Sequence, residues 1–221
     1  MKIRIILFIT LLITANLVVA GGRYKVSITN ITKGQTFTPQ MVATHARRVN
    51  LFTLGKAASD SLGILAESGN PEPLTNDLLA KGRAVSDVQT IAGLLAPGQT
   101  STIEMTSRHG YLSVAAMLIP TNDTFMAVNT VRLPRRGSVT YTALGYDAGT
   151  EQNDQNCVHI PGPRCDGEPN SPAADTDEGF VYVSNGFHDL GSFDDDENDI
   201  LGPATYDWRN PVAMIRITRI R

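Results

Sequence analysis

The sequence is poor in the residues that build most metal and redox centres. Its 221 residues contain two cysteines and four histidines, and the histidines stand singly at His45, His109, His159 and His188. There is no His-Glu-x-x-His pair, Walker loop, Gly-x-Ser-x-Gly elbow or Gly-x-Gly-x-x-Gly turn after a strand. We therefore expect the protein not to be an enzyme.

Positive charge is also scarce. The chain has 19 Lys plus Arg against 22 Asp plus Glu. The dense basic spots are Arg47-Arg48, Arg135-Arg136 and a tail with Arg216, Arg219 and Arg221. A nucleic-acid-binding protein usually has a basic face. We therefore interpret these spots as solvated surface and expect no nucleic-acid partner.

One long apolar run occurs, at the start of the chain. Lys2 and Arg4 precede the run at residues 5–13, and small residues end at Ala20. This order is typical of a secretory signal peptide, whereas a membrane helix needs about 20 apolar residues with little interruption. We predict a cleaved signal at residues 1–20, no later transmembrane segment, and a secreted, periplasmic or cell-envelope location. The mature chain, residues 21–221, would lose two positive charges from the 19, leaving 17 against 22 and a net charge of about −5.

The mature chain is predicted to form one domain, because its length suits a single core and no linker divides it. Short alternating segments rich in Val, Thr, Ile and Tyr predict strands near residues 24–29, 36–43, 100–106, 112–119, 125–133, 138–144, 179–184 and 212–219. Apolar spacing over Leu54, Ala58, Leu62 and Leu65, and again over 74–81, predicts two short helices between the early strands. The pattern indicates an all-β sandwich or barrel.

The two cysteines lie close together in sequence. Cys157 and Cys165 are separated by a segment with Pro161, Gly162 and Pro163, which turns the chain. In a reducing cytosol a metal site would be considered, but His159 would supply only a third ligand. In an exported chain this spacing favours a disulfide that closes one loop.

A turn after one predicted strand carries two acids. Asp147 and Glu151 flank Gly149, so both carboxylates could converge with a backbone carbonyl between them. Calcium accepts six to eight hard oxygen ligands and tolerates irregular geometry. Spacing alone leaves two interpretations open, a calcium site and a solvated turn.

Two separated motifs add a resemblance to a known family. Residues 119–125, Ile-Pro-Thr-Asn-Asp-Thr-Phe, and residues 146–151, Tyr-Asp-Ala-Gly-Thr-Glu, resemble the paired signatures of the spondin domain, the module of F-spondin and mindin. The order of elements agrees through Asp-Trp-Arg-Asn-Pro-Val-Ala at 207–213, and the run at 179–188 resembles stand-alone prokaryotic members.

The resemblance implies a C2-like antiparallel β-sandwich with a bound Ca²⁺. The implied ligands are Asp123, Asp147 and Glu151, the last standing where the family more often has aspartate. The implied function is that of an exported, calcium-stabilised module for binding or adhesion, with a protein or glycan ligand at the cell surface or matrix. The alternatives are a secreted metal-dependent hydrolase and a structural component of the envelope.

Overall fold

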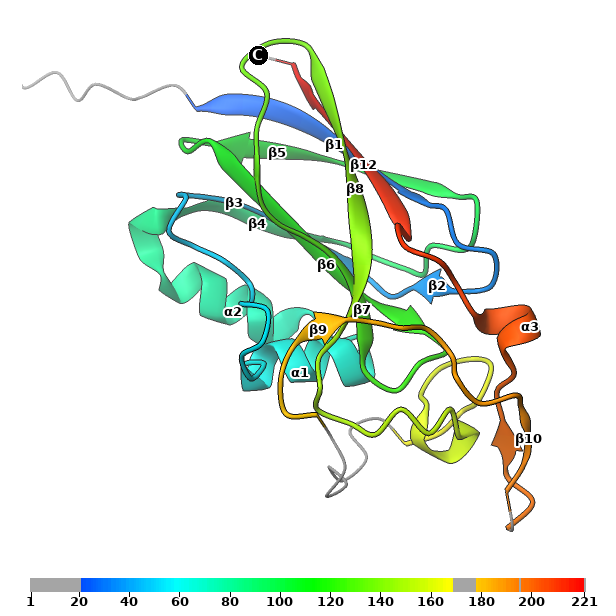
Figure 1. The fold of residues 1–221 in the computed structure, drawn as a ribbon. Coiled ribbons are helices and arrows are strands. Elements are labelled where there is room, and N and C mark those ends of the chain that lie inside the picture. The colour runs from blue at the N-terminus through cyan, green and yellow to red at the C-terminus, as the bar shows by residue number, and fades with distance from the viewer. Residues whose placement is uncertain (1–20, 169–177, 195, 221) are drawn as a thin grey trace, which may run out of the picture.

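A computed structural model describes residues 21–168, 178–194 and 196–220 (Figure 1). The predicted signal peptide, residues 1–20, lies outside the described residues. The longer strands are β1 (Gly22–Asn30), β3 (Gln40–His45), β4 (Val85–Ile91), β5 (Thr100–Ser107), β6 (Tyr111–Ile119), β7 (Thr124–Arg132), β8 (Ser138–Asp147) and β12 (Ala213–Arg219). The short strands are β2 (Thr36–Phe37), β9 (Tyr182–Val183), β10 (Ser192–Phe193) and β11 (Asp199–Ile200). The helices are α1 (Asp60–Ser68), α2 (Glu72–Ala80) and α3 (Pro203–Tyr206), and single 3₁₀ turns span Gly82–Ala84 and Cys157–His159.

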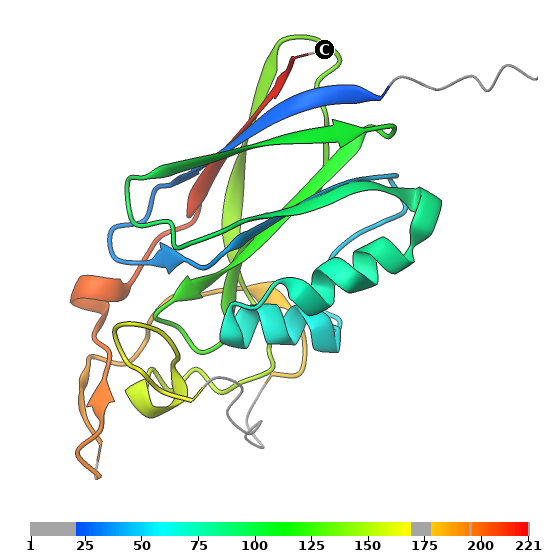
Figure 2. The same ribbon diagram turned by 180° about the vertical axis from the view of Figure 1, so that it is seen from behind.

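The long strands form one antiparallel sheet in the order β4-β3-β6-β7-β8-β12-β1-β5. This sheet curls until its two end strands, β4 and β5, approach each other, as Figure 2 shows from behind. The prediction of an all-β antiparallel sandwich with short helices is confirmed by this near-closed arrangement.

Side chains, rather than a backbone ladder, bridge the two end strands. Asp87 Oδ2 on β4 accepts from the Thr106 amide of β5 at 2.9 Å. Gln89 Nε2 donates to the Glu104 carbonyl at 3.1 Å. These contacts satisfy edge groups that an open sheet would leave to water or to another chain.

The main core fills the space enclosed by the sheet. Alternate residues of each strand point inward, among them Ile28, Val114 and Ile215, all fully buried. Period-two alternation places one set of side chains on a single face of a strand. The enclosed core therefore follows directly from the strand pattern.

A second apolar layer lies on the outer face of the same sheet. Met41, Ala115 and Phe125 point outward from β3, β6 and β7 and pack against Leu62 and Leu65 of α1. Strands β3, β6 and β7 are therefore covered on both faces. Helix α1 begins after Ser59, whose side chain accepts from the amide of Leu62, and it ends at Gly69 in the left-handed conformation, which glycine adopts readily.

Three details differ from the sequence predictions. The first helix begins at Asp60 and not near Leu54, which is 53% exposed and precedes Gly55 at a positive φ. The predicted strand at 36–43 is two strands, β2 and β3, separated at residues 38–39. Strand β4 was not predicted, because its apolar residues recur every third position, as in Val85, Val88 and Ile91.

Within the described residues, none of the helices has the length and apolarity needed to cross a membrane.

Candidate metal centre

Two connections meet at one end of the sheet. Residues 120–123 join β6 to β7, and residues 148–151 form the turn after β8. Thr124 pairs with Asp147 in the β7–β8 ladder, and the Ala148 amide donates to the Asp123 carbonyl at 3.3 Å. This pairing brings the two acidic motifs together although they lie about two dozen residues apart in the sequence.

The Asp123 carboxylate holds the 148–151 turn. Its Oδ2 accepts from the Thr150 amide at 2.8 Å, the Thr150 hydroxyl at 3.2 Å and the Glu151 amide at 3.2 Å. Asp123 is fully buried. One carboxylate oxygen is therefore saturated by donors from the turn.

The Asp147 carboxylate is fixed from the other side. Oδ1 accepts from the Gly149 amide and Oδ2 from Asn153 Nδ2, each at 2.9 Å. Tyr182 pairs with Asp147 in the β8–β9 ladder, and its hydroxyl accepts at 3.2 Å from the same Asn153 Nδ2 that donates to Asp147. Strand β9 thus contributes to the orientation of Asp147.

The backbone conformation of the turn requires glycine at position 149. Its φ is +65°, and a Cβ at this position would lie 2.4 Å from the Phe180 carbonyl oxygen. Few L side chains adopt such a φ, and the approach leaves no room for one. The turn between Asp147 and Glu151 is therefore defined by backbone constraints as well as by its acids.

The two aspartates are electrostatically coupled. Burial raises the pKa of Asp123 well above its usual value, and the charge of Asp147 raises it further. Burial also raises the pKa of Asp147, while the donors from Asn153 and Gly149 oppose that shift. Two buried carboxylates at close range are costly to ionise together unless a positive charge offsets them.

The site has a feature that suits a bound cation. Asp123 Oδ1 is buried and has no hydrogen-bond partner, which is rare for a carboxylate oxygen in a protein interior. A divalent cation between Asp123 and Asp147 would satisfy this oxygen and offset both charges. The residues present therefore fit a calcium ion.

The three-acid set remains a prediction. Glu151 is buried beside the pair, and its amide donates to Asp123. Within the described ranges, however, no group of three His, Cys, Asp or Glu side chains is arranged to hold a metal ion. The structure thus brings Asp123 and Asp147 together and places Glu151 in the same turn.

Sequence reasoning missed the partners of Asp147. Asn153 lies two residues beyond Glu151 in a polar loop. Only its amide side chain and its place near the acids could have indicated that it contacts Asp147. Tyr182 has no local signal, because its role depends on the long-range pairing of β8 with β9. Glu178 accepts from the Tyr182 hydroxyl at 3.0 Å and adds another acid near the site.

A cavity of about 180 Å³ lies beside this centre. Asp147 lines it, but Asp123 does not; the other lining residues are Asn153, Glu178, Tyr182, Ser184, Asn185, Gly186 and His188. The unsatisfied oxygen of Asp123 is therefore enclosed by protein.

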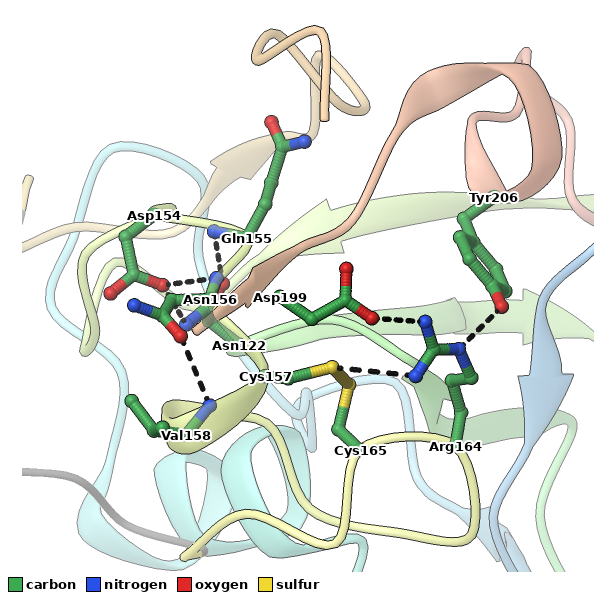
Figure 3. Close-up of a disulfide and its surroundings, with 10 residues drawn as sticks. All are labelled: Asn122, Asp154, Gln155, Asn156, Cys157, Val158, Arg164, Cys165, Asp199 and Tyr206. Carbon is green, nitrogen blue, oxygen red and sulfur yellow. Dashed lines mark hydrogen bonds and ion pairs between the residues drawn. A yellow bond between two sulfur atoms is a disulfide. The ribbon is translucent and has the colours of Figure 1, made fainter. Parts of the chain in front are cut away.

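Cys157 and Cys165 form the expected disulfide. Figure 3 shows how the closed loop is fixed: Arg164 donates to the Tyr206 hydroxyl of α3 at 2.8 Å and pairs with Asp199 of β11. Asp154, three residues before Cys157, accepts from Asn122 Nδ2 at 3.0 Å. Because Asn122 directly precedes Asp123, the segment that leads into the disulfide loop contacts the loop that carries Asp123.

Removal of the disulfide is expected to lower the free energy of unfolding by about 2–3 kcal/mol, the loop-entropy value for a cross-link of this span. The double variant Cys157→Ser/Cys165→Ser avoids leaving one thiol unpaired. Urea unfolding followed by circular dichroism measures the change, and reduction of the wild-type protein should reproduce it. An unchanged midpoint and slope in the double variant would show that the loop does not contribute to global stability.

The sequence was compared with models of known protein families, and one family model matches it. The profile of a family described as Spondin_N matches residues 29–157, more than half of the chain, from β1 to the first cysteine of the disulfide. Both acidic motifs lie inside the matched span. A search of curated proteins found no match.

Proposed function

Because this chain belongs to the Spondin_N family, a family of non-enzymatic extracellular modules, we propose that it is an exported, calcium-stabilised binding module. It would act in binding or adhesion at the cell envelope or in the extracellular space. Its partner would be a protein or glycan at the cell surface or matrix.

The observation that carries the calcium proposal is the buried Oδ1 of Asp123. This oxygen lacks a hydrogen-bond partner and lies beside a second buried carboxylate, Asp147. Unpaired buried charge is destabilising by several kcal/mol in general. A calcium ion supplies the missing positive charge, so ion binding and folding stability are coupled at this site.

The residues at this site would have two roles, binding the ion and orienting its ligands. Asp123 and Asp147 would hold the ion with Glu151, while Thr150 and Asn153 keep the two aspartates oriented through the bonds described above. The ion itself supplies charge compensation and rigidity. Fixed loops at one end of a rigid sheet are a common platform for recognition.

Enclosure favours a structural ion over a hydrolytic one. A metal-dependent hydrolase needs an open coordination position facing a cleft with a positioned base. Asp147 lines the neighbouring cavity, but Asp123 is fully buried and does not, so the oxygen without a partner faces protein and not the cavity. This geometry supports the binding module over the alternative of a secreted hydrolase.

Calcium should raise the melting temperature of chelator-treated protein. Extracellular calcium modules bind with dissociation constants of about 10⁻⁴–10⁻³ M. At 10 mM calcium this corresponds to about 1.4–2.7 kcal/mol of added stability, or a rise of roughly 3–10 °C for a domain of this size. Differential scanning calorimetry measures the shift.

Two variants separate site binding from a general charge effect. Asp147→Asn removes one proposed ligand and should abolish the shift. Asp166→Asn changes an exposed acid outside the proposed set and should retain it. The calcium proposal fails if wild-type protein shows no rise, or if both variants respond like wild type.

A further inference from the structure

Arginines that are scattered in the sequence gather at the end of the sheet opposite the candidate metal centre. They come from six chain segments: the start of β1, the loop after β3, the turn before β4, the β5–β6 hairpin, the β7–β8 loop and the end of β12. These residues are Arg23, Arg47, Arg48, Arg83, Arg108, Arg132, Arg135, Arg136 and Arg219, called here the arginine end. All nine are exposed, and none of the connecting loops contains an acid.

Backbone contacts show that the segments are neighbours. The Arg219 amide donates to the Gly137 carbonyl, directly after Arg136, and the Ile220 amide donates to the Arg23 carbonyl. On the other side, the Leu133 amide donates to Gly110 at 2.9 Å. In Figure 1 the C-terminus, the β7–β8 loop and the start of β1 lie together at the top, while the loops of the metal centre lie at the bottom.

The contacts continue across the remaining loops. His109 Nε2 bonds to the Arg83 carbonyl at 2.8 Å, and the Ala46 amide donates to Ala84 at 2.8 Å. The loop with Arg47 and Arg48 therefore lies beside the turn with Arg83 and the β5–β6 hairpin. Figure 2 shows the same grouping from behind.

Most of these guanidinium groups are available for an external anion. In the part of the chain that the structure describes, Arg23 is the one member paired with an acid, Glu104 at 2.5 Å. Arg132 lies over the ring of Tyr111 at 5.7 Å, and Arg219 over that of Tyr24 at 5.9 Å. Stacking of this kind restrains the side chain while the N–H edge stays open to an anion.

We propose that the arginine end binds an acidic polysaccharide through its carboxylate or sulfate groups. Guanidinium presents a planar fork of donors that matches these oxyanions in bidentate geometry. A polymer with repeated negative charge can contact several loops at once, and each contact releases counterions. The spread of arginines over separate loops suits a chain better than a single small anion.

The other anionic partners fit less well. Membrane surfaces are usually bound with several apolar side chains that insert beside the charges. Most large exposed apolar residues of the described chain lie elsewhere; near this end they are Leu79, four residues before Arg83, and Ile220, 54% and 39% exposed. We choose a polysaccharide over a nucleic acid because the protein is proposed to be exported. The arginine end itself is separate from the proposed calcium site.

The charge asymmetry would also orient the bound protein. Exposed acids lie in the loops on the side of the metal centre, at Asp166, Glu168, Glu178, Asp189, Asp196 and Glu197. A polyanion attracts one end of the molecule and repels the other. The metal-centre loops would then face away from the polysaccharide and stay open to a second partner.

Binding to heparin, as a sulfated probe, and to polygalacturonate, as a carboxylated probe, tests the proposal. Titration calorimetry at 50 mM salt on the full mature chain should detect binding to at least one probe and none to neutral dextran. Arg135→Glu/Arg136→Glu should weaken this binding by about tenfold or more. Lys33→Glu/Lys56→Glu makes the same change in net charge at exposed positions away from the arginine end and should have little effect.

Each other outcome contradicts the proposal. These outcomes are absence of binding to both acidic polymers, an equal loss in both double variants, and tighter binding to duplex DNA or to anionic vesicles than to either polysaccharide. Circular dichroism of the variants confirms that they are folded. Because calcium enters none of these measurements, failure here leaves the calcium proposal standing, and the reverse also holds.

Discussion

Asp123→Ala is expected to lower the free energy of unfolding by about 2–4 kcal/mol in saturating calcium, and to remove the response to calcium. The substitution takes away the acceptor of the Thr150 and Glu151 amides. Each buried donor left without a partner costs about 1–3 kcal/mol. It also removes a proposed ligand, so the stabilisation by the ion is lost at the same time.

The same substitution should have a smaller effect when calcium is chelated. Without the ion, the buried charge of Asp123 is opposed by that of Asp147, and removal of one carboxylate relieves this repulsion. Asp77→Ala, at an exposed acid of α2, is the matched control and should stay within about 0.5 kcal/mol of wild type. An equal loss in calcium and in chelator would assign Asp123 a purely structural role. Urea unfolding under both conditions gives the comparison.

In chelator, the two aspartates are expected to make the protein more stable as the pH falls through their raised folded-state pKa values. The pKa values of Asp123 and Asp147 are raised in the folded state, mainly by burial. A carboxyl group with a raised folded pKa binds its proton more tightly when folded. Its favourable contribution is complete below the unfolded pKa, about 3.9, and is lost as the pH rises through the folded pKa.

Calcium should weaken or reverse this pH dependence, because protons and the ion compete for the same carboxylates. Buried His45 has a lowered pKa, caused first by burial, and so contributes the opposite slope below about pH 6.5. Asp123→Asn keeps His45 intact, and the difference between wild type and this variant isolates the carboxyl contribution. Melting curves from pH 5 to 8 measure it. Identical slopes for both proteins in chelator would contradict the coupling.

The strand pattern made the fold largely predictable. Alternation in β1 and β12 predicted half-buried strands, and both lie in the sheet with their apolar residues inward. Strand β4 escaped prediction because its apolar residues recur every third position, as in Val85, Val88 and Ile91. Its backbone pairs with β3, and it meets β5 through polar side chains such as Asp87. Most of its residues are half-buried on both faces, so neither face shows the alternation of a half-buried strand.

The candidate sites were predictable to different degrees. Asp147 was identified from the acids of its own turn, Asp123 through the resemblance to the spondin domain, and the disulfide because Cys157 and Cys165 are close in sequence. The position of Tyr182 beside Asp147 and the grouping of the arginines could not be predicted, because both depend on which distant strands pair. Arg47-Arg48 and Arg135-Arg136 were interpreted as separate solvated spots, but the fold places them at one end of the sheet.

Calcium content per chain tests the central proposal most directly. Wild-type protein in equilibrium dialysis against labelled calcium, at concentrations up to 10 mM, should approach about one bound calcium per chain, the stoichiometry of the implied site. Asp123→Ala dialysed in parallel should bind none. Wild-type protein with no bound calcium at 10 mM would contradict the assignment of Asp123 and Asp147 as a calcium centre.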